Sequence, residues 1–347
     1  MAVSRSQPAD LVVVGAGPVG LFTAFYGGLR GLRVTVLDSL DEPGGQISAL
    51  YPEKLIRDVA GLPSVRGRDL VDALVRQVEP FSPEWRLGHA AVSLDDGEHG
   101  FTLGCADGTR VRGRSVVVTG GVGTFTPRAL PGGDAYAGRG LSYFVRDPAA
   151  LAGQRVLIVG GGDSAFDWAD TLHEVAAEVV MVHRRDRFRA HQDTVDRVLG
   201  HGIRVYTNSQ IQALHGDPAL DAAVIADASA GKTTTVECDH IVAALGFIAN
   251  LGPIGSWGLD LHDRHIVVDA MMRTSRPGVF AAGDICSYPG RVPLIAVGFG
   301  EAAMAVNHAA VFLDPRSSAF PGHSTDGPGH STDGRGVQAL SAAPVPS

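Results

Sequence analysis

Two short glycine-rich segments, far apart in the chain, constrain its fold more than any other feature of the sequence. GAGPVG at 15–20 and GGGDSA at 160–165 each follow a run of apolar residues and precede a stretch with helical spacing of small and apolar side chains. An unbroken apolar run is typical of a parallel strand buried on both faces, and glycine allows the tight turn from such a strand into a helix. The sequence therefore predicts an α/β fold with two Rossmann-like, three-layer dinucleotide-binding domains.

The first glycine segment has the pattern of a complete dinucleotide site. Gly15, Gly17 and Gly20 follow the apolar run 11–14, and Asp38 closes the next apolar strand, 18 residues after Gly20. The glycines permit a pyrophosphate to approach the helix N-terminus, and an acid at this place accepts hydrogen bonds from ribose hydroxyl groups. Because the acid would repel a 2′-phosphate, we predict FAD at this site.

The second segment differs where the acid would stand. The apolar strand expected at 179–182 ends in His183, Arg184 and Arg185, with Arg189 close behind. Arginine at this place accommodates a 2′-phosphate, and each charged hydrogen bond contributes roughly 1.5 to 3 kcal/mol. We therefore predict NADP(H) here, and a solvated basic strand end is the alternative.

Charge, hydropathy and cysteine content argue against several other classes of protein. A net charge of −8, from 29 basic and 37 acidic residues, disfavours a nucleic-acid binder. The N-terminus lacks the apolar core of a signal peptide and no window approaches 18 consecutive apolar residues, so we expect a cytoplasmic protein that is not in a membrane. Cys105, Cys238 and Cys286 are too widely spaced for a C-x-x-C motif or a metal-type cluster, and no metal site is predicted.

The order of motifs resembles one group of flavoproteins. GAGPVG, PGGQ at 43–46, GGGDSA, HRRDRFRAH at 183–191 and VFAAGD at 279–284 follow one another as in the two-domain reductases built on the thioredoxin reductase plan. Within that plan the chain is most similar to the ferredoxin/flavodoxin NADP+ reductases of the thioredoxin reductase type. The pieces that carry this likeness are GGQISALYPEK, GVGTFTPRAL, GFIANLGPI, FAAGDICSYPGRVPLIAVGFGEA and a C-terminal GHST, within about residues 11–326.

The resemblance implies a division of the chain into domains. It places FAD binding in residues 1–122 and 246–320 and NADPH binding in residues 123–245. Residues 321–347 would form a segment that covers the flavin, followed by a mobile tail. The heptapeptide PGHSTDG occurs twice in this segment, so His323 and its copy His330 both remain candidates for the covering side chain.

The resemblance also implies individual roles. Tyr51 and His323 would stack on the two faces of the flavin ring, the backbone at Ala91 would meet the adenine, and Phe125 would pack near the flavin at the domain crossover; taken singly, Tyr51 and Phe125 are more often core aromatics. The implied FAD-binding residues are Gly15, Gly17, Pro18, Gly20, Asp38, Gly45, Gln46, Tyr51, Ala91, Phe125, Gly283, Asp284, Ser324 and Thr325. The implied NADP-binding residues are Gly161, Gly162, Asp163, Ser164, His183, Arg184, Arg185 and Arg189.

The implied activity is electron transfer between NADP(H) and ferredoxin or flavodoxin, by hydride transfer to flavin N5 and then single-electron transfer to the carrier. No catalytic acid, base or nucleophile is expected, because the cofactors supply the chemistry. The missing C-x-x-C disfavours a dithiol reductase, while an NADPH oxidase or monooxygenase-like flavoprotein and a nonenzymatic NADPH sensor stay open. A homodimer is implied by the resemblance.

A carrier of this kind is acidic, so a chain with net charge −8 needs a local positive patch to bind it. Two groups of arginines are candidates for this patch. The alternative for both groups is that they are ordinary solvated surface residues. One group is Arg57, Arg66, Arg68 and Arg76, and the other is Arg110, Arg112 and Arg114.

Overall fold

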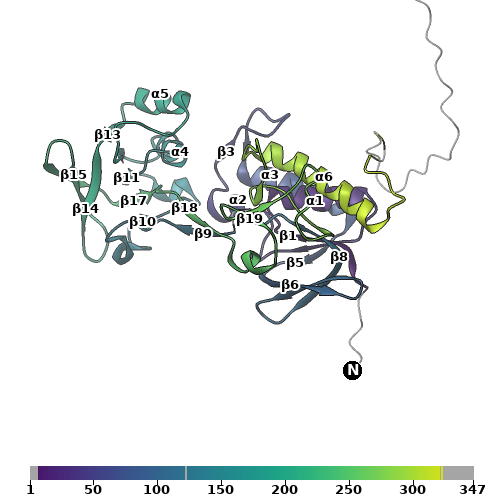
Figure 1. Cartoon of the computed structure of the whole chain (residues 1–347). Coiled ribbons are helices and arrows are strands. Elements are labelled where there is room, and N and C mark those ends of the chain that lie inside the picture. The colour runs from purple at the N-terminus through teal and green to yellow at the C-terminus, as the bar shows by residue number, and fades with distance from the viewer. Residues whose placement is uncertain (1–6, 122, 321, 323–347) are drawn as a thin grey trace, which may run out of the picture.

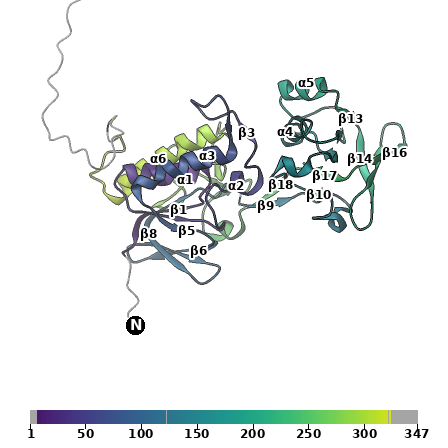
Figure 2. The same ribbon diagram turned by 180° about the vertical axis from the view of Figure 1, so that it is seen from behind.

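The chain folds into two lobes joined by a narrow two-stranded connection (Figure 1), as seen in a computed structural model that describes residues 7–121, 123–320 and 322. Figure 2 shows the same separation of the lobes from behind. Each lobe is built around its own sheet and has its own hydrophobic core. The two glycine-rich segments therefore belong to two separate structural units.

The first lobe contains a seven-stranded sheet. Its strands are β1 (Ala9–Val14), β2 (Val34–Leu37), β5 (Glu84–Arg86), β6 (Ala91–Gly97), β7 (Gly100–Cys105), β8 (Arg110–Val118) and β21 (Val279–Ala281). β1 pairs in parallel with β2 and β8, and β21 pairs in parallel with β8. Leu11, Val12 and Val13 have no exposed surface, as expected for a strand covered on both faces. The carboxyl ends of these parallel strands meet at one edge, where the first glycine segment lies.

Helices cover one face of this sheet, and the antiparallel strands β6 and β7 extend its edge (Figure 1). The helices are α1 (Pro18–Leu29), α3 (Gly67–Val78) and α6 (Ile295–Leu313). α1 packs against both α3 and α6. Within the described residues, α6 has the length and hydropathy of a membrane-spanning helix, but Ala302, Ala305 and Ala309 are fully buried against the lobe. Packing in the core accounts for the apolar residues on its buried face.

The second lobe has three layers around a five-stranded parallel sheet. Its strands, in order across the sheet, are β10 (Leu141–Ser142), β17 (His240–Ala243), β11 (Arg155–Val159), β12 (Glu178–Val182) and β13 (Arg204–Tyr206). Val156 and Ile158 of β11 face α4 (Asp163–Leu172) and α5 (Gln192–Gly200) in one core. Leu157 and Val159 belong to a second core with the antiparallel strands β14 (Ser209–His215), β15 (Ala222–Asp227) and β16 (Lys232–Glu237). The alternation of side chains along β11 thus builds both layers.

Two antiparallel strands, β9 (Thr124–Pro127) and β18 (Phe247–Asn250), carry the chain between the lobes. The expected domain boundaries at 122/123 and 245/246 lie next to these strands, and the division into domains stays a prediction. The remaining elements are α2 (Gln46–Leu50), β3 (Leu55–Ile56), β4 (Val65–Arg66), β19 (Leu261–His262), β20 (His265–Val267), β22 (Cys286–Ser287) and the 3-10 turns η1 (Glu79–Phe81), η2 (Gly133–Tyr136), η3 (Pro148–Leu151) and η4 (Gly252–Ser256).

Candidate dinucleotide-binding sites

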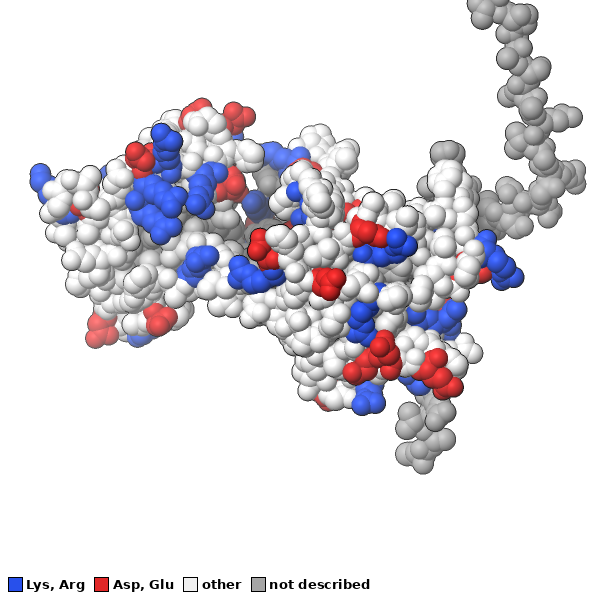
Figure 3. Space-filling view, in the orientation of Figure 1, with Lys and Arg blue, Asp and Glu red and all other residues white. Residues whose placement is uncertain are grey.

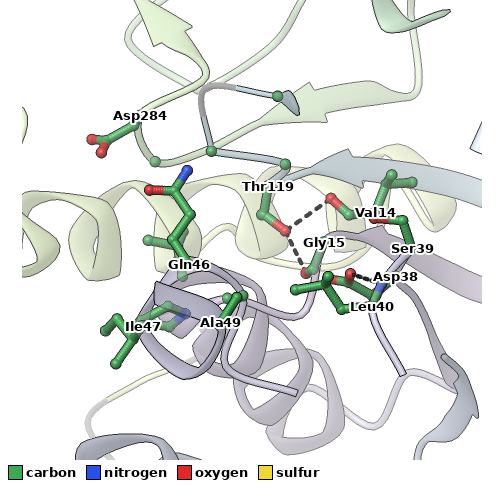
Figure 4. A pocket seen from close by; sticks show the side chains of 18 of the residues that line it. Val14, Gly15, Asp38, Ser39, Leu40, Gln46, Ile47, Ala49, Thr119 and Asp284 are labelled. Carbon is green, nitrogen blue, oxygen red and sulfur yellow. Dashed lines mark hydrogen bonds between the residues drawn. The ribbon is translucent and has the colours of Figure 1, made fainter. Parts of the chain in front are cut away.

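A cavity of about 530 Å³ opens at the carboxyl ends of β1, β2 and β8 in the first lobe. Its wall is formed by the first glycine segment, the end of β2, α2, the segment after β8, the segment after β21 and the start of α6. Figure 4 shows these elements converging from opposite sides of the space. In an α/β fold this edge is where ligands bind, so the cavity has the position expected for a dinucleotide.

The glycines of the first segment serve three different physical needs. Gly15 has φ +111°, and a Cβ there would lie 2.6 Å from the carbonyl oxygen of Thr119. A Cβ on Gly20 would lie 1.8 Å from the carbonyl oxygen of Gly15, so this glycine allows α1 to begin directly beneath the turn. A Cβ on Gly17 would meet no atom within 4 Å, and Gly17 lines the cavity. Gly17 therefore leaves open a space that a phosphate group fits.

Asp38 ties the end of β2 to the glycine turn. Its Oδ2 accepts a hydrogen bond from the backbone N–H of Ala16 (2.5 Å) and its Oδ1 accepts one from the backbone N–H of Leu40 (2.8 Å; Figure 4). Burial raises the pKa of Asp38, and the backbone hydrogen bonds oppose that rise. A carboxylate has about four lone-pair sites, so that of Asp38 keeps acceptor capacity beyond these backbone partners. The side chain lines the cavity and can accept from ribose hydroxyl groups there.

α2 brings Gln46 and Tyr51 to the opposite wall. The turn before it requires glycine, since Gly45 has φ +58° and its Cβ would lie 3.0 Å from Cα of Gly17. Tyr51 is in contact with the hydrophobic cores of both lobes. Burial, together with the negative charges of Asp284 and Asp58, raises the pKa of Tyr51 to about 12. The phenol therefore stays neutral and offers a flat ring at the end of the cavity.

A buried carboxylate fixes the segment after β21. Glu301, whose side chain is 3% exposed, accepts hydrogen bonds from the backbone N–H of Gly283 (2.6 Å), the hydroxyl of Tyr288 (2.7 Å) and Nε of Arg291 (3.1 Å). Arg291 also donates to Asp284 (3.1 Å), which lines the cavity. Sequence reasoning missed this network. The feature of the sequence that could have indicated it is the single acidic residue, Glu301, in the otherwise apolar stretch 295–306.

The second glycine segment is covered by the chain that follows β12. The imidazole of His183 packs directly on Gly161, where a Cβ would lie 2.3 Å from its Nδ1. His183 Nε2 is 3.0 Å from the carbonyl oxygen of Arg187 and so carries the proton. Burial and the neighbouring arginines lower the pKa of His183, which keeps the ring neutral. Arg189 donates its backbone N–H to the carbonyl of Gly161 (2.8 Å), which closes the turn.

The four arginines of this segment remain available to a ligand. Arg184, Arg185, Arg187 and Arg189 are exposed, and no side-chain ion pair joins them to another described residue. Figure 3 shows Lys and Arg side chains gathered on this lobe near α5. Asp163, at the start of α4, accepts a hydrogen bond from the backbone N–H of His191 (2.9 Å). The arrangement places several unpaired positive charges beside a helix N-terminus, which suits a phosphorylated nucleotide.

Comparison with known proteins decides the family. Residues 9–309 match the model of the pyridine nucleotide-disulphide oxidoreductase family. The chain is 56% identical to the ferredoxin–NADP reductase of Salinispora tropica, with 91% of this chain and 98% of the relative covered. It is 53% identical to that of Nocardioides sp., with 94% and 100% covered. The chain belongs to the ferredoxin–NADP reductase family of the thioredoxin reductase type.

Solved structures confirm the predicted fold of this reductase family. The thioredoxin reductase of T. acidophilum superposes with a TM-score of 0.78 at 27% identity and covers 90% of this chain and 100% of its own. A Lactococcus lactis thioredoxin reductase in the FR conformation gives a TM-score of 0.76 at 26% identity, with 88% and 99% covered. The α/β plan with two dinucleotide-binding domains and the family resemblance predicted from the sequence are both correct.

The three thiols of the reductase are buried. Burial raises the pKa of Cys238 to about 12, with the nearby negative charge of Asp239 adding to the effect, and it raises the pKa of Cys286 well above its usual value. Cys105 is buried as well. A thiol reacts as its thiolate, so these side chains are not suited to exchange with a disulfide.

The structure places the other predicted site residues as follows. Pro18 and Ala91 line the cavity, Gly162 precedes α4 and Ser164 lies in its first turn. At Phe125 the backbone belongs to β9. His323, Ser324, Thr325 and His330 lie outside the described residues. The binding roles of all these residues stay predictions.

One group of side chains in the second lobe contains the atom types of a metal site: Asp170, His173 and His201. The two imidazole rings stack with centroids 3.7 Å apart, and Nε of Arg197 lies 3.0 and 2.9 Å from the two oxygens of Asp170. These contacts join the ends of α4 and α5. They account for the group as packing between the two helices.

Proposed function

We propose that this chain is an NADPH-dependent FAD enzyme that transfers electrons between NADP(H) and ferredoxin, with flavodoxin as a second carrier. Relatives that are 50–56% identical over most of the chain are named ferredoxin–NADP reductase. One observation carries the proposal. The first lobe has a cavity lined by Asp38, and the second lobe has a glycine turn beside exposed arginines that form no ion pair with another described residue. Two different nucleotides fit this pair of sites.

FAD would be held in the cavity of the first lobe. Gly15 and Gly17 would receive its pyrophosphate, with Gly20 letting α1 begin beneath the turn. Asp38 would receive its ribose, and Gln46 and Tyr51 the ring system. When bound, FAD supplies an acceptor for hydride and a donor of single electrons. The protein contributes the fixed backbone N–H groups, the neutral phenol and the exclusion of water by the cavity wall.

NADP(H) would bind at the second glycine turn. Arg184 and Arg185 would hold its 2′-phosphate, and the N-terminus of α4 would face its pyrophosphate. His183 serves here in a way that the sequence did not suggest. Its neutral ring packs on Gly161 and supports the turn, and its Nε2–H is already used by the carbonyl of Arg187.

Electrons would pass from the flavin to the carrier without a thiol relay. The sequence contains no C-x-x-C, and Cys105, Cys238 and Cys286 are buried. Burial holds the pKa of Cys286, the thiol nearest in sequence to the cavity residue Asp284, well above its usual range. A dithiol mechanism therefore lacks its reacting groups.

Of the two candidate carrier patches, we favour the one on the β3–β4 hairpin. Arg57 and Arg66 are exposed there, in the segment that follows Tyr51. Arg110, Arg112 and Arg114 lie toward the start of β8, whereas the cavity meets its end after Val118. At about 3.3 Å per residue, Arg114 and Arg110 lie roughly 13 and 26 Å from the Val118 end of β8. A carrier on the hairpin would be closer to the flavin.

We also propose a homodimer in the cytoplasm. Met304 and Phe312 on α6 are 42% and 45% exposed, and a second copy of the chain would cover such an apolar strip. The measurement is the molecular mass in solution by light scattering. A monomer at micromolar concentration would contradict the dimer and leave the proposed reaction untouched.

The deciding experiment is anaerobic reduction of the purified protein by NADPH, with NADH in parallel, followed by transfer to ferredoxin and to flavodoxin. We expect a yellow protein that NADPH bleaches and that either carrier re-oxidises. Fast oxygen consumption without a carrier would favour an oxidase. Bound flavin that NADPH does not bleach would favour a sensor, and a protein purified without flavin would overturn the proposal.

A further inference from the structure

Lys54 is unusual in this chain because lysine is almost absent from it. Of the 29 basic residues, Lys54 and Lys232 are lysines and the others are arginines. Lysine differs from arginine in presenting one compact ammonium group on a flexible stem, without a planar fork. A lysine three residues after Tyr51 therefore calls for a structural explanation.

The ammonium group of Lys54 bridges the two lobes. Its Nζ lies 2.7 Å from Oδ2 of Asp167, and the two side chains are 35% and 29% exposed. The same Nζ lies 5.7 Å from the centroid of the Tyr51 ring, within the range of a cation–π contact. One charge thus contacts both a helix of the second lobe and the aromatic ring at the end of the cavity.

Both partners of this ion pair are held by rigid structure. The backbone N–H of Lys54 donates to the carbonyl of Tyr51 (3.1 Å), and its own carbonyl accepts from Gly67 at the start of α3 (2.9 Å). Asp167 lies in α4, four residues after Asp163. At 1.5 Å per residue this is about 6 Å along the helix from the end that faces the second glycine turn. The ion pair therefore connects the two nucleotide sites by short, ordered paths.

Two more contacts cross the gap at the same place. Nε of Arg146 donates to the carbonyl of Ala49 in α2 (2.9 Å). Tyr51 itself packs against the cores of both lobes. Since the chain passes between the lobes through the two strands β9 and β18, contacts beside α2 help to fix how the second lobe is oriented toward the cavity.

We propose that Lys54 is a positioning residue for the transfer of hydride from NADPH to the flavin. It holds α4 beside Tyr51 and so keeps the two nucleotides in the relative placement that the transfer needs. This inference rests on the proposed function. Oxidation of the reduced flavin by a small neutral quinone needs neither NADPH nor a charged docking surface, so that step serves as the reference for Lys54 variants.

A chemical crosslink tests the contact without any measurement of activity. A water-soluble carbodiimide activates a carboxylate, and an adjacent amine then forms an amide with it. The chain offers only two lysine side chains for this reaction, and Lys232 lies on β16 as an internal control. We expect mass spectrometry to find a 54–167 crosslinked peptide, which the Asp167→Asn variant lacks. Crosslinks at Lys232 with none between Lys54 and Asp167 would overturn the inference.

Rapid-mixing kinetics test the role. A misplacement of about 1 Å costs up to 100-fold in rate, so we expect Lys54→Gln and Asp167→Asn each to slow flavin bleaching by saturating NADPH by about 10-fold. The two changes combined would slow it no further, because they remove one interaction. The exchanged pair, Lys54→Asp with Asp167→Lys, would recover most of the rate. Anaerobic re-oxidation of the reduced protein by a small neutral quinone, which needs no charged docking surface, would be unchanged in every variant.

The controls separate this inference from the proposed function. Lys232→Gln is the matched lysine variant and would behave as the wild type, and FAD content and thermal unfolding would verify that each variant is folded. A wild-type protein that NADPH does not bleach would contradict the proposed function. A wild type that is bleached normally, with Lys54→Gln equally fast or faster, would overturn the positioning role alone.

Discussion

Replacing Gly17 and Gly20 by alanine, one at a time, separates binding of FAD from stability of the first lobe. A methyl group on Gly17 would meet no protein atom within 4 Å and would enter the cavity. A methyl group on Gly20 would lie 1.8 Å from the carbonyl oxygen of Gly15 and 2.8 Å from Oγ1 of Thr119. The same chemical change therefore acts on the ligand at one position and on the fold at the other.

The magnitudes follow from these distances. A carbon and an oxygen come no closer than about 3.3 Å, so the Gly20→Ala variant has to open the turn by roughly 1.5 Å. Overpacking of this kind costs about 1–3 kcal/mol, which lowers the Tm by roughly 2–12 °C in a unit of this size. In Gly17→Ala, the loss of a favourable residue before α1 and the lower entropy of the unfolded chain nearly cancel. Loss of one charged hydrogen bond to the pyrophosphate, about 1.5–3 kcal/mol, weakens FAD binding roughly 10- to 100-fold.

The assay compares FAD titration of the apoprotein with thermal unfolding of the same preparation. Gly17→Ala is expected to bind FAD weakly and unfold like the wild-type apoprotein, and Gly20→Ala to unfold at a lower temperature. Wild-type FAD affinity in Gly17→Ala would refute the placement of the phosphates at this turn. An unchanged Tm in Gly20→Ala would refute the steric argument.

Three further predictions concern other parts of the molecule. Arg184→Gln and Arg185→Gln are each expected to raise the KM for NADPH about 10- to 100-fold and leave that for NADH unchanged, since each removes a charged contact to the 2′-phosphate; equal effects on both coenzymes would contradict this. Glu301→Gln, which breaks a buried ion pair, should cost roughly 3–5 kcal/mol and lower the Tm, as scanning calorimetry would measure. Burial lowers the pKa of His240 in the folded protein, so the unfolded chain takes up a proton at a higher pH than the folded protein does. The free energy of unfolding is therefore at its full value above about pH 6.5 and decreases as the pH falls from there through the pKa of the folded state. His240→Asn should flatten this dependence in denaturant titrations.

The strands and turns beside the glycines were predictable because their signals are local. The expected run 11–14 lies within β1, the expected strand 179–182 lies within β12, and the apolar run before the second glycine segment is observed as β11. Buried parallel strands are uniformly apolar, and turns that need positive φ or close packing select glycine. The same local chemistry, together with the order of the motifs, sufficed for the fold class and the family.

Contacts between segments that are distant in the sequence have no local sequence pattern that would predict them. The ring of His183 packs on Gly161 and its Nε2 donates to the backbone, which no local pattern indicated. Its role as a ligand of NADP(H) stays a prediction. The one sign of Glu301 is an acid within an apolar helix, and nothing in the sequence indicates that its three donors come from the segment 283–291. A sequence records residue types along one dimension, whereas a hydrogen-bond network depends on distances across the fold.

By itself, the sequence predicted two dinucleotide-binding domains, a difference in charge between them at the end of the second strand, and the absence of a C-x-x-C motif. Only the tertiary structure decided that Gly17 faces open space while Gly20 is enclosed, and that Lys54 meets Asp167 across the lobes. The first set depends on residue type and short spacing, which are properties of the sequence whatever its fold. The second set arises from packing, because the free space at a glycine and the partner of a charge are set by neighbours far away in the chain.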